Sequence, residues 1–233
     1  MQPYLFPYIG YFQLVAAADR FVFLDDVAFI KKGWVHRNRI LVNGAAHTFT
    51  VPVADASQNR AINATTIHRD AFEPGKLLRT IQLSYRRAPH FPAAFEIAQC
   101  VLAAPHATIS DMAKHSVRAV CGHLGISTPI VETSADYDNA SLKGAQRIRD
   151  IAVREGASRY INPIGGTELY SVAEFAGAGI ELRFLKTRGI TYPQFDAPFV
   201  PSLSVLDVLM FNSPDAIRAM LRDFDLVRAD PAA

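Results

Sequence analysis

The chain has 233 residues, of which 50% are hydrophobic and 20% charged, so it can bury a sizeable core and is not expected to be disordered except at its ends. The formal net charge of +2 argues against a nucleic-acid-binding surface that covers the whole molecule, and leaves a local basic patch open. No apolar run approaches the roughly 20 residues that cross a bilayer, and the start lacks the basic region of a signal peptide. Cys100 and Cys121 lack metal-ligand spacing. We therefore expect a cytoplasmic protein with reduced cysteines and no transmembrane segment.

The first part of the chain predicts a loop, a helix, a strand and a hairpin. The opening MQPYLFPYIGYFQLV is rich in aromatic residues and proline, and fits either an aromatic edge strand or a loop that holds a ligand. Residues 12–18 suit a helix, and 21–26 read as a buried strand that ends in Asp25 and Asp26. Residues 39–53 alternate around Asn43-Gly44, which predicts a β-hairpin. Two helices follow, one around 77–85 and one over 91–104.

From residue 110 onward, helices and short strands alternate. Helices are predicted over 110–125, 141–156 and 167–179, capped in the first two cases by Ser110 and Ser141. Strands are predicted over 126–131, 159–164 and 180–185, and helices over 204–211 and 214–224 close the chain. This alternation predicts an α/β fold with a mainly parallel, Rossmann-like sheet flanked by helices. We expect one domain over 1–228, with the hairpin as an insertion, and a frayed tail over 229–233.

The stretch FLDDVAFIKKGWVHRNRI carries the strongest chemical signal. Asp25 and Asp26 follow a strand, and ligands of open α/β sheets lie beyond the carboxyl ends of the strands. Five cationic or titratable side chains then surround Trp34, which suits a phosphate joined to a flat or sugar-like group. They are Lys31, Lys32, His36, Arg37 and Arg39. The alternative is a solvated basic loop in which Trp34 is a packing anchor.

Two further stretches are weaker candidates. In INPIGGTELY, a strand ends at Asn162, and Gly165-Gly166 leads into a predicted helix whose free N–H groups would hold an anion. A tight strand-to-helix turn explains the same residues without a ligand. In SLSVLDVLMFN, a capping box accounts for Ser204 and Asp207. The seven histidines show no metal-binding pattern, so we predict no metal site from side chains.

Taken in order, QPYLFPYIGYFQLV, FVFLDDVAFIKKGWVHRNRIL, YRRAPHF, YINPIGGTELY and LSVLDVLMFN resemble the WbqC-like family of bacterial proteins, over essentially the whole chain. This resemblance implies a link to genes for O-antigen (lipopolysaccharide) and other surface polysaccharides, and a role in transferring glycine or otherwise decorating sugars. Members of this family usually carry a short apolar strand before the QPY block, whereas this chain starts at Met1. Either the start was assigned late or the first strand is cut short.

A second resemblance concerns the opening loop. Nucleotidyltransferases with the HIGH motif place His-x-Gly-His between a first strand and a helix, and Tyr8-Ile9-Gly10-Tyr11 falls in the same kind of place. The resemblance implies a HIGH-nucleotidyltransferase-like fold with a degenerate loop, in which Gly10 lets a nucleotide approach closely. Tyrosines carry no positive charge at neutral pH, so Lys31, Lys32 or Arg37 would have to supply it.

We thus expect an enzyme, a transferase that moves an aminoacyl or similar group onto a sugar or nucleotide sugar, with Asp25 or Asp26 as general base and Lys32 beside them. The remaining expected contacts to the substrate are Gln2, Tyr4, Tyr8, Gly10, Tyr11, Lys31, Trp34, Arg37, Asn38, Asn162, Gly165 and Gly166. Alternatively, the aspartates hold Mg²⁺ beside a nucleotide phosphate, or only pair with neighbouring cations. Three other functions remain open. They are a non-catalytic module that binds a nucleotide sugar or partner enzyme, a nucleotidyltransferase-like enzyme with a degenerate HIGH loop, and a nucleic-acid binder that uses residues 31–39. The near-neutral charge disfavours the nucleic-acid binder.

Overall fold

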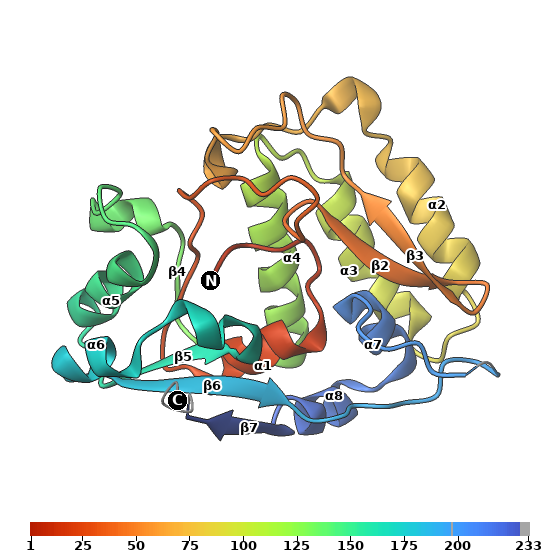
Figure 1. The fold of residues 1–233 in the computed structure, drawn as a ribbon. Helices are drawn as coiled ribbons and strands as arrows, with labels where there is room; N and C mark the ends of the chain where they lie inside the picture. The colour runs from red at the N-terminus through yellow and green to blue at the C-terminus, as the bar shows by residue number, and fades with distance from the viewer. Residues whose placement is uncertain (197, 229–233) are drawn as a thin grey trace.

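The structure is a computed structural model that describes residues 1–196 and 198–228, and the expected tail over 229–233 lies outside the described residues. Eight α-helices are present in the described part of the chain (Figure 1). They are α1 (Ile9–Ala17), α2 (Pro74–Tyr85), α3 (Phe91–Ala103), α4 (Ile109–Leu124), α5 (Gly144–Arg154), α6 (Val172–Gly177), α7 (Val205–Phe211) and α8 (Pro214–Met220). The strands are β1 (Phe21–Val22), β2 (Arg37–Val42), β3 (Ala45–Thr50), β4 (Ile130–Val131), β5 (Arg159–Pro163), β6 (Glu181–Thr187) and β7 (Phe224–Val227).

The strands of the described residues form three small sheets. β1 pairs in parallel with β4, and β5 pairs in parallel with β6, whose other edge pairs antiparallel with β7. The mixed α/β class is confirmed, but a single Rossmann-like parallel sheet is not. β7 supplies the antiparallel strand, and only its first residue, Phe224, lies in the helix predicted over 214–224.

The first residue extends the small β1–β4 pair on its other side. The Met1 amine donates to Val22 O (2.7 Å), and Leu24 N donates to Met1 O (2.8 Å). Met1 therefore runs beside β1, so that Gln2 and the residues after Leu24 leave the strands at the same end.

The predicted hairpin is present. β2 and β3 pair from Arg37↔Thr50 to Val42↔Ala45, and the turn residues Asn43 and Gly44 both have positive φ (51° and 75°). These are the backbone angles that an Asn-Gly turn favours. In Figure 1 the hairpin and β4 lie on opposite sides of α4.

Three predicted helix starts are displaced. α4 is capped by Thr108, which forms a capping box with Asp111, and Ser110 is the buried second residue of the helix. α5 begins at Gly144 after Lys143, without the expected Ser141 cap. The helix expected over 167–179 is split into a 3₁₀ turn (Ile164–Leu169) and α6, because the chain is extended at Tyr170 (φ −132°, ψ 135°).

Most buried side chains form one large core around α1, α3, α4 and α7, with Phe12, Val117 and Leu206 fully buried. A second, smaller cluster joins Ala152 of α5 to Phe175, Ile180, Leu182 and Phe184. Within the described residues, no helix is both long and apolar enough to cross a bilayer.

Candidate functional site

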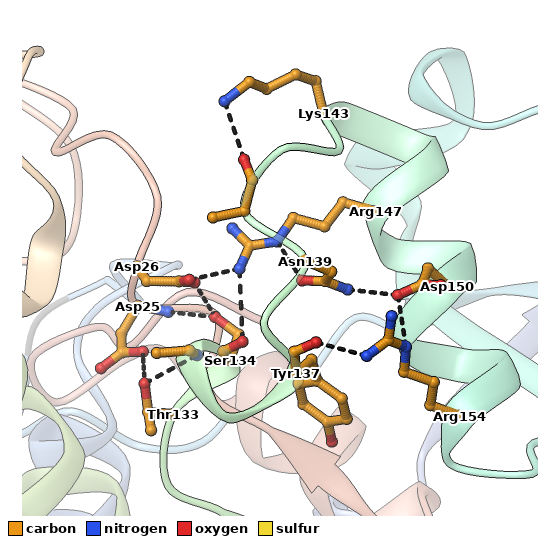
Figure 2. Close-up of polar contacts among 12 residues, drawn as sticks. Asp25, Asp26, Thr133, Ser134, Tyr137, Asn139, Lys143, Arg147, Asp150 and Arg154 are labelled. Carbon is orange, nitrogen blue, oxygen red and sulfur yellow. Dashed lines mark hydrogen bonds and ion pairs between the residues drawn. The ribbon is translucent and has the colours of Figure 1, made fainter.

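Asp25 and Asp26 lie just beyond β1, next to the segment that follows β4. Because β1 and β4 are parallel, their carboxyl ends meet at one edge. There, Thr133 and Ser134 approach the two aspartates, and α5 packs beyond them (Figure 2). This is the edge at which the sequence predicts a ligand site.

Asp25 is sealed inside the protein, with 1% of its side chain exposed. Its carboxylate accepts hydrogen bonds from Thr133 Oγ1 (2.7 Å), Ser110 Oγ (3.2 Å) and Lys114 Nζ (2.5 Å). Lys114 belongs to α4, so Asp25 is held to that helix by a buried ion pair. A carboxylate enclosed in this way holds the site together and is not available to a substrate.

Asp26 is the more accessible of the two, with 14% of its side chain exposed. Its Oδ2 accepts a hydrogen bond from Arg147 Nη2 at 2.5 Å, and its Oδ1 accepts one from Ser134 Oγ. Burial opposes ionisation of Asp26, but the hydrogen bonds and charge of Arg147, together with Ser134, outweigh it and lower the pKa of the carboxyl group. Asp26 is therefore ionised at neutral pH.

Arg147 is itself held by a chain of polar contacts that Figure 2 lets the reader follow. Its Nε donates to Asn139 Oδ1 (2.9 Å), and Asn139 Nδ2 donates to Asp150 Oδ2 (2.7 Å). Asp150 in turn pairs with Arg154 Nε (2.9 Å), whose Nη1 donates to Tyr137 O (2.5 Å). With only 6% of its side chain exposed, Arg147 is fixed in place and presents its guanidinium group to Asp26.

The tyrosines of the opening loop differ in their availability. Tyr11, expected to contact a ligand, is buried (1% exposed), and its hydroxyl donates to Gln2 O (2.9 Å). Tyr8 is 40% exposed, and Tyr4 is half-buried with its hydroxyl 3.4 Å from Gln2 Oε1. Burial raises the pKa of both Tyr4 and Tyr8, which keeps their hydroxyl groups protonated and able to donate.

Gly10 is required by the protein's own side chains. A Cβ at this position would collide with the Tyr8 ring and lie 2.8 Å from Thr187 Oγ1 of β6. The space that the sequence assigned to a closely approaching ligand is therefore occupied by Tyr8 and Thr187.

The basic segment forms a separate cluster. The guanidinium groups of Arg37 and Arg39 lie 5.4 Å and 5.6 Å from the ring centre of Trp34, which is 40% exposed, and Lys31 and Lys32 are exposed. In the part of the chain that the structure describes, the ion-pair partners of the aspartates are Lys114 and Arg147. The aspartates therefore pair with cations of α4 and α5, and not with those of the basic segment.

Asn38 is a structural residue, in contrast to its expected role in binding. It is 5% exposed, and its Nδ2 donates to Leu5 O (3.0 Å) and Phe6 O (2.6 Å). Both acceptors belong to the opening loop, so Asn38 ties β2 to this loop and has no donor left for a substrate.

Asn162 and the glycine pair lie at the end of β5. Asn162 shares the wall of a cavity of about 570 Å³ with Met1 and Leu24, which places it near the start of the opening loop. A Cβ on Gly166 would collide with the Asn162 amide, so Gly166 serves this packing, whereas Gly165 is open. The turn that follows is a 3₁₀ helix of six residues, which is too short to act as the predicted anion-binding helix start.

The residues that hold the aspartates were missed by sequence reasoning. Lys114, Thr133, Ser134 and Arg147 are separated from Asp25 and Asp26 by 89 to 121 positions, and each sits in a stretch that reads as an ordinary helix or turn. The one local hint is that Ser110 and Lys114 lie four positions apart, on one face of α4. Among the described residues, no three His, Cys, Asp or Glu side chains gather as a metal site.

Fold and site together define a mixed α/β protein with two neighbouring carboxylates, one sealed and one accessible, at the carboxyl end of a parallel strand pair. The chain belongs to the WbqC-like protein family, whose sequence model matches residues 2–219, and the predicted resemblance is thus confirmed. It is also similar to the uncharacterized protein Rv1507c of Mycobacterium tuberculosis (strain ATCC 25618 / H37Rv), with 30% identity over 220 residues that cover 91% of this chain and 93% of that protein. No solved structure matches the chain.

Proposed function

We propose that the chain is a transferase of surface-polysaccharide biosynthesis that moves an aminoacyl group, such as glycine, or a similar group onto a sugar or nucleotide sugar. The observation that carries the proposal is the Asp26–Arg147 pair at the carboxyl end of the parallel β1–β4 strands. Arg147 is buried, and Asn139 fixes it directly, with Asp150 and Arg154 behind Asn139. A surface ion pair does not require such an ordered arrangement. It is the kind of fixed arrangement on which a reacting group is positioned.

In this proposal Asp26, and not Asp25, faces the acceptor. Its two oxygens accept one hydrogen bond each from Arg147 and Ser134, which leaves acceptor capacity for an amine or hydroxyl group of the substrate. Its lowered pKa makes it a weak base, so it orients the attacking amine or hydroxyl group first and accepts the proton of that group as the bond to the aminoacyl carbonyl carbon forms. The bond between that carbon and the activating group of the donor breaks in the same reaction, and the activating group leaves with the electron pair. Tyr4 and Tyr8 supply hydrogen-bond donors, and Lys32 and Trp34 are proposed to approach the phosphate and sugar of the nucleotide-sugar acceptor.

The experiment compares binding and transfer in Asp26→Asn and wild type, with Asp70→Asn as the exposed control. A nucleotide sugar such as UDP-glucose at about 100 times its dissociation constant should stabilise the wild-type protein by roughly 2.7 kcal/mol, with and without Mg²⁺ tested separately. Asp26→Asn should keep affinity for the nucleotide sugar within about threefold, and should lower the rate at which glycine passes from an activated glycyl ester to that nucleotide sugar by about 10² to 10⁴. Equal rates in Asp26→Asn and wild type would exclude the catalytic role.

One observation favours a second candidate, a non-catalytic module that binds a nucleotide sugar or a partner enzyme. Both carboxylates are compensated by cations, Asp25 by Lys114 and Asp26 by Arg147, which is also how a purely structural network is built. This candidate predicts that ligand stabilisation occurs without turnover. It also predicts that Asp26→Asn leaves the affinity for the nucleotide sugar unchanged, once the effect of the substitution on stability is subtracted.

A further inference from the structure

A second cavity lies away from Asp25 and Asp26, between the turn of the hairpin and the end of α2. It encloses about 480 Å³, which is within the usual range of small-molecule sites. Asn43 and Gly44 form one wall, Arg86 and Arg87 the second, and residues 194–196 the third. None of these residues belongs to the site proposed above.

Two neighbouring arginines give this cavity its chemical character. Both are exposed, and no ion pair within residues 1–196 and 198–228 includes Arg86 or Arg87. Arg87 is steadied by the ring of Phe195, whose centre lies 5.6 Å from the guanidinium carbon. Leu83, with 58% of its surface exposed, adds an apolar patch to the same cavity. Guanidinium groups that lack a carboxylate partner match the paired oxygens of a phosphate.

Residues 194–196, the third wall of the cavity, lie above a buried carboxylate that holds Gln194 in place. Asp207 of α7 is fully buried and accepts hydrogen bonds from Tyr85 (2.8 Å), Tyr192 (2.7 Å) and Gln194 Nε2 (2.6 Å). Gln194 Oε1 also accepts from Val200 N (2.6 Å), so both ends of the Gln194 amide are held.

Phe195 itself is held in a strained conformation. Its φ of 53° lies in the left-handed region, which a non-glycine residue adopts at a cost, and its ring packs edge-on against Phe211 at 4.7 Å. Strain of this kind persists only where the surrounding structure enforces it, and it clusters at ligand sites. Here it places the ring under the guanidinium group of Arg87.

We propose that this cavity is a second ligand site, which binds the phosphate or pyrophosphate group of a small molecule between Arg86 and Arg87. Asp196 lies in the same wall and sets the limit on affinity, because its negative charge opposes the incoming anion. The apolar surface of Leu83 accommodates the organic part of the ligand.

Isothermal titration of the full chain with inorganic pyrophosphate tests the proposal. Replacing both arginines with glutamine should weaken binding by about tenfold or more for each charge removed, and Arg86→Gln alone by about tenfold. Asp196→Asn should tighten binding about two- to fivefold, an effect that loss of folding cannot imitate. Arg79→Gln, on the exposed face of α2, is the matched control and should stay within about twofold of wild type.

Three results would overturn the proposal. The first is no binding of pyrophosphate to wild type at about 5 mM. The second is equal affinity in wild type and the double arginine variant, whose melting temperature is measured alongside. The third is a loss of affinity in Lys32→Ala with none in Arg86→Gln, which would assign the anion to the site near Asp26. The outcome of this pyrophosphate titration does not depend on whether Asp26 is catalytic.

Discussion

Asp25 and Asp26 are adjacent in the sequence, but their surroundings give them different properties. Asp25 faces inward to Lys114, Ser110 and Thr133. Asp26 faces Arg147 at the edge of the protein, and its pKa is lowered. Asp26 therefore contributes stability above the pKa of 3.8 that it has in the unfolded chain, and this contribution is lost as the pH falls through its lower folded value.

Asp26→Asn should therefore lower the free energy of unfolding near neutral pH, and the deficit relative to wild type should shrink as the solution is acidified. Urea unfolding from about pH 7 down to about pH 3 measures this difference. Asp70→Asn, at an exposed position, should track wild type throughout. A deficit of constant size at every pH would mean that Asp26 contributes through packing and not through its charge.

Gly10 offers a test of close packing at single-residue scale. Gly10→Ala should destabilise the fold by about 1–3 kcal/mol, because the added methyl group must displace the Tyr8 ring or Thr187. Gly122→Ala is the matched control: its Cβ meets nothing within 4 Å in the interior of α4, so it should stabilise by up to about 1 kcal/mol. Urea unfolding of both variants gives the comparison. Equal effects of the two substitutions would contradict the packing account of Gly10.

At the scale of elements, the opening loop is held by three parts of the chain that are far apart in sequence. Phe6 O accepts from Asn38 of β2 and from Ser204 before α7 (2.8 Å), and Phe6 N donates to Ser116 of α4 (2.9 Å). Phe6 has a φ of 44°, so these bonds also enforce an unfavourable backbone conformation. These contacts therefore hold the opening loop in one conformation.

Asn38→Ala should loosen this loop while leaving most of the fold intact. It removes two hydrogen bonds that together hold Leu5 and Phe6, so amide hydrogens over residues 4–8 should exchange about tenfold faster. Hydrogen–deuterium exchange with mass spectrometry measures this, and Asn59→Ala, at an exposed position, is the control. Unchanged amide exchange over residues 4–8 would mean that the hydrogen bonds of Ser116 and Ser204 are sufficient to hold the loop.

The elements that local sequence signals define were the ones that could be predicted. The Asn43-Gly44 turn fixed the hairpin, hydrophobic periodicity located α2 to α5, and the strand before Asp25 was recognisable from its apolar run. Sheet membership could not be predicted, because β1 and β4 are two residues each and their pairing depends on long-range packing. The partners of the aspartates were missed for the same reason. The local sequence around a lysine or arginine on a helix does not indicate which carboxylate will pair with it in the folded protein.

At the scale of the whole molecule, one large core and one small cluster stabilise the chain. The small cluster is centred on Phe175, which stacks on Tyr160 at 5.4 Å and is fully buried. α5 and β5 contribute to it, and they also carry Arg147 and Asn162. The sequence predicts one domain over 1–228, so we expect the two clusters to unfold together.

Phe175→Ala should destabilise the fold by about 3–5 kcal/mol, since it leaves a cavity at the centre of the small cluster. One sharp urea transition at a lower midpoint, seen by both fluorescence and circular dichroism, is expected if the clusters unfold as one unit. Two separate transitions would instead divide 1–228 into two folding units. Leu169→Ala, with 68% of that side chain exposed, should change stability by less than about 0.5 kcal/mol.

The ion pairs of the aspartates also bear on the order of folding. Lys114 is 89 positions from Asp25, and Arg147 is 121 positions from Asp26. Closing such long loops is costly and slow, so two adjacent negative charges remain uncompensated until both helices have docked. A growing polypeptide therefore cannot complete this pocket before residue 147 has been synthesised. Substitutions at Arg147 should accordingly speed unfolding much more than they slow folding.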